Sequence, residues 1–195
     1  MGGLGGRPPG RGSGPPHEAY HGPMGSLGRP LFWVTFACYA ALIAWQAGNL
    51  PDEVPAHSSF DGTVDRWGTL TEHLVMGFAT GVLMLLLGPG LGVVLRRLPR
   101  STVNLPHPEY WKRDEHWPEA VRRLTGTMWA FGVLLNLFMI FVMGSVGEAA
   151  LGRPVPGWLF GTALALFLAA TGVWVVGLHR TMRVPAEPWQ GATRR

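Results

Sequence analysis

Charged residues are scarce in this sequence, and four long stretches contain none. Asp, Glu, Lys and Arg together make up 14% of the chain, against about 25% in a typical soluble domain. The uncharged stretches are residues 31–48, 74–95, 124–146 and 157–178. About 17–25 apolar residues in a helix span a bilayer, and a helix pairs its backbone groups within its own segment. We therefore predict an all-α integral membrane four-helix bundle and exclude a soluble globular domain.

Cysteine is also nearly absent, which excludes an intrachain disulfide. The single cysteine, Cys38, lies inside the first uncharged stretch, where a small apolar residue suits a helix. The isoelectric point near 10.0 does not indicate nucleic acid, because the basic residues flank the apolar stretches instead of forming one stripe with aromatics. The predicted surroundings of this chain are therefore the lipid bilayer, with no nucleic acid as a partner.

The basic residues predict how the chain threads the membrane. Of the 16 Lys and Arg, 14 flank the stretches on one side, whereas Arg66 and Arg153 lie on the other. Positive residues are retained in the cytoplasm. We therefore expect a multi-pass protein of the bacterial cytoplasmic (inner) membrane with both termini in the cytoplasm and outer loops at 49–73 and 147–156.

Composition divides the chain into five segments. A Gly/Pro-rich start cannot bury enough apolar surface to order itself, so we predict a disordered tail. A loop follows the second helix, and within it Tyr110 and Trp111 are expected as anchors at the headgroup level. A surface helix from Pro118 should then turn into the third span, with Arg122 and Arg123 on anionic lipid. The predicted segments are 1–30 (tail), 31–95 (helices one and two), 96–123 (cytoplasmic loop with an interfacial helix), 124–179 (helices three and four) and 180–195 (cytoplasmic tail).

Several local patterns predict helix ends and contacts. Thr69 and Glu72 fit a capping box before the second stretch, and Pro89 between two glycines predicts a kink or an early end. Asn136 should form an interhelical hydrogen bond, with a place in a substrate path as the alternative. Close helix packing, within the bundle or in a homodimer, is indicated by two small-residue spacings, Gly77/Gly81 and Gly157/Gly161.

The first outer loop is the stretch richest in polar and turn-forming residues. Its prolines and the pair Asp61-Gly62 indicate a compact, ordered cap with a turn. His57, Asp61 and Asp65 could converge on a ligand, and whether this group binds anything stays open. Because the spacing of the carboxylates and imidazoles, His73 included, matches no metal signature, we predict neither a metal nor a cofactor.

The same loop resembles a known family. Its pattern Leu50-Pro51-x-x-Val54-Pro55-x-His57, followed by Gly62 and Asp65, is similar to the signature of the bacterial membrane family called domain of unknown function 1648. The resemblance covers about residues 32–90, and Ser58 stands where members usually carry an aromatic. Residues 104–111 also look like a segment of longer members. The residues to which the resemblance gives a structural or binding role are Leu50, Pro51, Pro55, His57, Gly62 and Asp65.

The resemblance implies a membrane protein without catalytic residues, distantly similar to immunity proteins against a secreted peptide toxin. The expected role is a non-enzymatic accessory, sensor or immunity-type module, with a membrane protein or a second copy as possible partner. A small transporter or channel-like protein is the alternative, although the centres of the spans lack ionisable residues. An enzyme using the His57 group is not expected, because no nucleophile–base pair or phosphate loop accompanies it.

Overall fold

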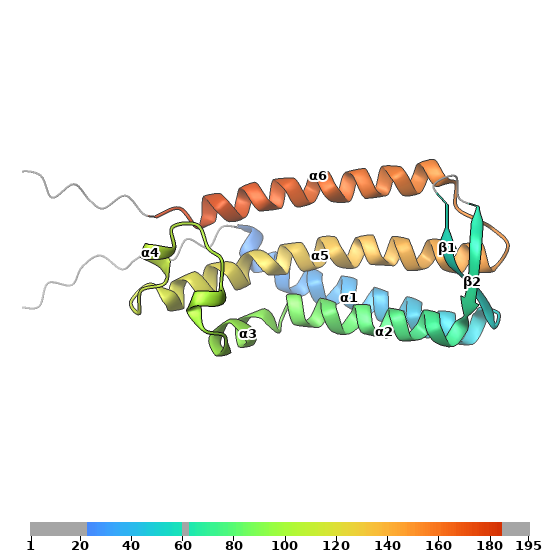
Figure 1. Cartoon of the computed structure of the whole chain (residues 1–195), viewed down its shortest axis with the longest axis horizontal. Coiled ribbons are helices and arrows are strands. Elements are labelled where there is room, and N and C mark those ends of the chain that lie inside the picture. The colour runs from blue at the N-terminus through green and yellow to red at the C-terminus, as the bar shows by residue number, and fades with distance from the viewer. Residues whose placement is uncertain (1–22, 60–62, 185–195) are drawn as a thin grey trace, which may run out of the picture.

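The computed structural model describes residues 23–59 and 63–184 of the chain. Within these ranges the chain forms six α-helices, one short 3-10 helix and a two-stranded β-hairpin (Figure 1). In chain order, the elements are α1 (Pro23–Asn49), β1 (Glu53–Ser58), β2 (Val64–Thr69), α2 (Leu70–Leu87), α3 (Leu91–Arg97), η1 (Arg100–Thr102), α4 (Pro108–Trp111), α5 (Trp117–Ala150) and α6 (Gly157–Thr181).

Four of these helices are long and apolar enough to cross a membrane. They run side by side between two ends (Figure 1). The terminal end holds the start of α1, the end of α6 and the segments α3 and α4. The hairpin end holds β1, β2 and the α5–α6 connection, residues 151–156. The four candidate spans, Leu27–Asn49 in α1, Leu70–Leu87, Trp117–Ala150 and Gly157–Thr181, confirm the predicted number.

The first helix begins earlier than the sequence predicted. Disorder over residues 1–30 is wrong for 23–30, which are the first turns of α1; residues 1–22 lie outside the described chain. Gly28 lies directly on α5, because a Cβ added there would be 3.1 Å from the Cβ of Trp129. The Arg29 guanidinium lies over the same indole ring, 5.6 Å from its centroid. These contacts with a distant helix order a segment whose local composition predicts disorder.

The helices do not form a closed four-helix bundle. α1, α2 and α5 pack against one another, whereas α6 packs mainly on α5 and contains no buried residue (Figure 1). Aromatic side chains hold α6 in place: Phe138 and Phe167 stack at 4.4 Å between ring centroids. Trp174 Nε1 also donates to the backbone oxygen of Thr127 over 2.9 Å. The predicted bundle is therefore corrected to three packed helices with α6 attached along one side.

Glycines bring the three central helices close together. A Cβ added at Gly77 would lie 2.9 Å from Ile43 Cδ1, and one at Gly81 would lie 3.5 Å from Tyr39 Cε1. Intramolecular packing is thus confirmed for the Gly77/Gly81 spacing. It is not found at Gly161, where nothing lies within 4 Å of the corresponding position, so the homodimer alternative stays a prediction there.

The predicted hydrogen bond of Asn136 and the predicted ends of α2 are also found. Asn136 is fully buried and its Nδ2 donates to Phe32 O at 3.2 Å and to Thr35 Oγ1 at 3.0 Å, which joins α5 to α1. At the start of α2, Glu72 N donates to Thr69 Oγ1 and Thr69 N donates to Glu72 Oε2, which completes the capping box. The helix ends at Leu87, just before Gly88-Pro89-Gly90.

A second apolar core fills the terminal end. α5 has 34 residues, about 51 Å at about 1.5 Å per residue, so it exceeds the roughly 30 Å of a hydrocarbon layer. Its first turns pack under the loop and the end of α6, and they continue into the third span without a break. The predicted helix from Pro118 is therefore found as the start of α5, without the predicted turn before the third span. The core consists of Leu95, Leu105, Trp111, Trp117, Ala120, Val121 and Met182.

Polar contacts in this core correct two further expectations. Trp111 is not a headgroup anchor: it is 1% exposed, and its Nε1 donates to Met182 O over 2.7 Å. Arg123 lies over the Trp111 ring and donates to Glu119 and to the backbone oxygen of Thr181. Arg122 binds the two carboxylate oxygens of Glu119. Both arginines thus bind protein groups, and Trp111 and Arg123 satisfy carbonyls that the end of α6 leaves unpaired.

Candidate functional site

The family-like loop forms a β-hairpin, which the prediction of an all-α chain had missed. β1 pairs antiparallel with β2, with Val54 opposite Gly68 and Pro55 opposite Trp67, and the register shifts between Pro55 and His57. β1 also packs against α5 and α2. Two strands alone are marginal in water, so the hairpin depends on the helix ends beneath it. This dependence explains why the local sequence indicated an ordered loop without strands.

The predicted motif residues divide into two groups. Leu50, Val54 and Pro55 are buried between the hairpin and the helices, and the Leu70 amide donates to Asp52 O over 2.8 Å, which closes the base of the hairpin. These residues attach the hairpin to the membrane helices. The exposed group comprises Pro51, His57 and Asp65, whereas Gly62 lies outside the described residues.

His57 and Asp65 meet on the exposed surface of the hairpin. His57 Nδ1 lies 2.6 Å from Asp65 Oδ1, and Ser59 Oγ donates to Asp65 Oδ2 over 3.0 Å. The His57 side chain is 63% exposed and that of Asp65 is 45% exposed. The hydrogen bond from His57 lowers the pKa of Asp65 below its usual value. Two of the three suspected residues thus pair, and the third, Asp61, lies outside the described chain.

This pairing resembles a structural cross-strand link more than a reaction centre. Asp65 accepts from both His57 and Ser59, so its two oxygens hold the β1 side of the hairpin to β2. Within residues 23–59 and 63–184, no three His, Cys, Asp or Glu side chains are grouped closely enough to hold a metal ion.

The lowered pKa of Asp65 predicts a dependence of hairpin stability on pH. A carboxylate whose pKa is lowered on folding contributes stability above its unfolded pKa, near 3.8, and loses that contribution as the pH falls through the folded pKa. We expect amide exchange in β1 and β2 to be slower in the wild type than in Asp65→Asn at neutral pH. The difference should disappear below the folded pKa. An undiminished difference in strong acid would contradict this assignment.

A buried polar contact that sequence reasoning missed lies beneath the hairpin. Gln46 is fully buried, and its Nε2 donates to Met143 O in α5 over 2.7 Å. Its Oε1 lies 2.9 Å from His73 Nε2 in α2, so His73 must donate this hydrogen bond. The Gln46 amide thereby joins α1, α2 and α5. The sequence signalled this contact only through one amide in an otherwise apolar stretch.

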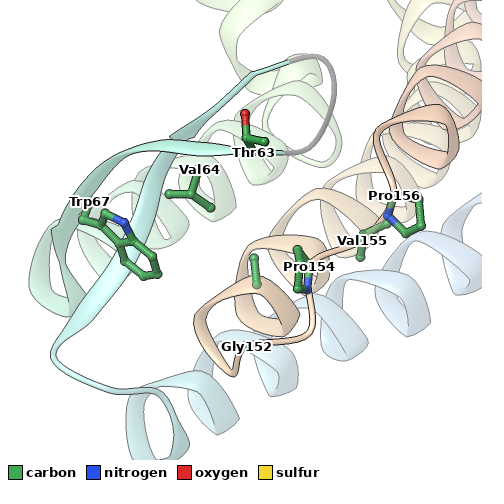
Figure 2. Close-up of a pocket in the computed structure, with 8 residues that line it drawn as sticks. Thr63, Val64, Trp67, Gly152, Pro154, Val155 and Pro156 are labelled. Carbon is green, nitrogen blue, oxygen red and sulfur yellow. The ribbon is translucent and has the colours of Figure 1, made fainter.

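A shallow groove separates the hairpin from the α5–α6 connection (Figure 2). Val64 and Trp67 form one wall, and Pro154 faces them from the other wall. The groove holds about 520 Å³ and is predominantly apolar, and Trp67 is 51% exposed. Gly152 has a φ of 76°, which permits the sharp turn of the connection. The residues that line the groove are Thr63, Val64, Trp67, Ala149, Gly152, Pro154, Val155 and Pro156.

The segment that builds the hairpin is similar to a known family. Residues 34–80 match the family described as "Domain of unknown function (DUF1648)". The match covers the last part of α1 from residue 34, the whole hairpin and α2 as far as residue 80, and it supports the predicted relation for that segment. Neither a curated protein nor a solved structure matches the chain.

The DUF1648 segment supplies only one side of the groove. Val64 and Trp67 belong to it, whereas the facing residues, such as Pro154, come from the α5–α6 connection far outside the matched range. The signature residues Leu50, Val54 and Pro55 have a structural role, because they are buried under the hairpin.

Proposed function

We propose that this protein is a non-enzymatic multi-pass membrane module that recognises a polypeptide partner at its hairpin end, as an accessory subunit, sensor or immunity-type protein. The observation that carries the proposal is the groove between β2 and the α5–α6 connection, which is apolar and lies at the end of the helices (Figure 2). It contains an exposed tryptophan, Trp67, a residue type that contributes strongly to binding at interfaces.

The groove is supported from below, which favours binding. The buried residues Leu50 and Val54 attach the hairpin to the helices, and the hydrogen bonds of Gln46 join the helices beneath it. A surface that is already ordered loses little conformational entropy when a partner binds. Pro154 and Pro156 stiffen the opposite wall in the same way, because the proline ring restricts the backbone.

Charge indicates the chemistry of the partner. Asp52, Glu53 and Asp65 are exposed on the hairpin together with one arginine, Arg66, so its net charge is negative. The pKa of Asp65 is lowered by its bond to His57, so it stays ionised. Arg153 beside the groove is already paired with Glu148 over 2.9 Å. An acidic surface with an apolar groove is complementary to a cationic segment that carries apolar side chains.

We also propose which end of the molecule faces each side of the membrane. In a bacterial cytoplasmic membrane, the terminal end would face the cytoplasm, because the sequence assigns 14 of the 16 Lys and Arg to that side of the spans. The hairpin end would face outward, and the partner would be a secreted polypeptide or the outer part of another membrane protein. The alternative, a small transporter or channel, has less support because the buried polar side chains Gln46 and Asn136 are engaged in hydrogen bonds between helices.

Site-specific photocrosslinking in native membranes tests this function. A benzoylphenylalanine in place of Trp67 should yield a discrete polypeptide adduct, and the crosslinked segment, identified by mass spectrometry, should carry net positive charge. The matched control places the same probe at Val173, which is 74% exposed and lies in the second half of α6, away from the groove, and should give no such adduct. Adducts with lipid alone at position 67, or equal polypeptide adducts at both positions, would overturn the proposal.

A further inference from the structure

We propose that the terminal end binds the headgroups of anionic phospholipids through three arginines, Arg96, Arg97 and Arg180, named here the free arginines. The proposal concerns the end opposite the groove and does not depend on the proposed function. All three side chains are exposed. Arg96 and Arg97 lie in the last turn of α3 and Arg180 lies in the last turn of α6.

The carboxylates of the terminal end leave these three arginines uncompensated. Asp114 pairs with Arg100, and Glu119 pairs with both Arg122 and Arg123. Within the described chain, the side chains of the free arginines form no hydrogen bond or ion pair with another residue. The basic residues of this end are therefore of two kinds, those that stabilise the fold and those that remain available to an external anion.

The free arginines lie where membrane-spanning helices leave the hydrocarbon layer. α2 has 18 residues, about 27 Å at about 1.5 Å per residue, so it crosses a layer of roughly 30 Å with little excess. α3 follows after Gly88-Pro89-Gly90 and packs against α5 (Figure 1). Arg180 lies one residue before the end of α6. The guanidinium groups are thus placed beside the lipid headgroups.

The surroundings of Arg96 and Arg97 distinguish a lipid from a soluble anion. On α3, Leu95 faces the core at 6% exposed, whereas Val93 and Val94 are 52% and 36% exposed. A short helix with exposed apolar and cationic side chains suits the boundary between acyl chains and headgroups. The guanidinium group binds phosphate oxygens in pairs, and the arginine stem stays in the apolar layer. A phospholipid satisfies both parts of this surface, whereas free phosphate satisfies only one.

Lipid retention by the purified full-length protein tests the proposal. Protein in a neutral detergent is mixed with equal amounts of dioleoyl phosphatidylglycerol and dioleoyl phosphatidylcholine, and the bound lipids are counted by native mass spectrometry. The wild type should retain phosphatidylglycerol preferentially. Each Arg→Gln change at the three positions should reduce that preference, by up to about fivefold, because a basic residue near an anionic surface contributes about 1 kcal/mol.

Matched variants make the result specific. Arg153→Gln at the hairpin end removes another exposed arginine and should leave the preference unchanged. Arg96→Lys/Arg97→Lys keeps the charge and should retain most of it. The proposal is overturned if the triple Arg→Gln variant retains phosphatidylglycerol like the wild type, or if the two lipids bind equally to the wild type. It is also overturned if soluble glycerol 3-phosphate displaces phosphatidylglycerol at equal concentration, since that would indicate a site for a free anion.

Discussion

Replacing Gly132 by alanine is expected to lower the thermal unfolding midpoint of the purified protein. A Cβ at this position would lie 2.6 Å from Phe32 Cδ2 and 2.7 Å from Phe32 Cε2. The ring has little room to move, because the backbone of Gly88 also lies close to it, with a Cβ there only 2.7 Å from Phe32 Cε2, and Trp129 packs edge-on against it at 5.3 Å between centroids. Overpacking of this kind costs about 1–3 kcal/mol, and each kcal/mol lowers the midpoint by about 2–4 °C.

Gly126 on the same helix provides the control. Nothing lies within 4 Å of the Cβ position there, so Gly126→Ala should leave stability unchanged or raise it by up to about 1 kcal/mol through helix propensity. The clash also predicts coupling: Phe32→Leu should reduce the cost of Gly132→Ala, because a smaller side chain leaves room for the new methyl group. Equal midpoints for the Gly126 and Gly132 variants would contradict the packing described here.

Replacing Trp111 by alanine is expected to have the larger effect, a loss of about 3–5 kcal/mol. The indole is 1% exposed at the centre of the terminal core. It also donates to Met182 O over 2.7 Å and supports the Arg123 guanidinium 4.9 Å from its centroid. Its removal leaves a cavity, an unpaired carbonyl and an arginine without its aromatic surface. The last turn of α6 should therefore loosen first.

Hydrogen exchange locates this effect. In Trp111→Ala, the backbone amides of the last turn of α6 should exchange faster than in the wild type. The thermal unfolding midpoint of this variant should also be lower. Trp111→Phe keeps an aromatic ring but removes the indole N–H, so it should lose less, about 1–3 kcal/mol, the cost of a buried carbonyl left without a donor. Trp158→Ala is the control, because its side chain is 71% exposed and should change neither quantity. If Trp111 were a headgroup anchor, as the sequence suggested, Trp111→Ala would behave like Trp158→Ala.

The features that were predicted correctly are determined by residues close to one another in the sequence. The capping box of Thr69 and Glu72 closes within one turn of helix. The end of α2 follows from Pro89, whose ring prevents a regular helix wherever it stands. Asn136 was recognised because a buried amide in an apolar helix requires a partner, although its partners Phe32 and Thr35 could not be named in advance.

The candidate site could be predicted only in part. The pattern from Leu50 to Asp65 identified the hairpin segment, and residues 34–80 match the corresponding family. The other wall of the groove, with Pro154, comes from about 90 residues further along the chain. The bond between Gln46 and Met143 O joins residues 97 positions apart. No local pattern encodes contacts of this length.

The sequence by itself determined the four apolar spans, the distribution of basic residues around them and the local ends of the helices, because these follow from solvation and from contacts within a few residues. Only the tertiary structure decided which faces of the helices meet. A helix in lipid is apolar all round, so its hydropathy gives its length but not its partners. That is why α6, the buried Trp111 and the hairpin resting on the helix ends became evident only once the chain had folded.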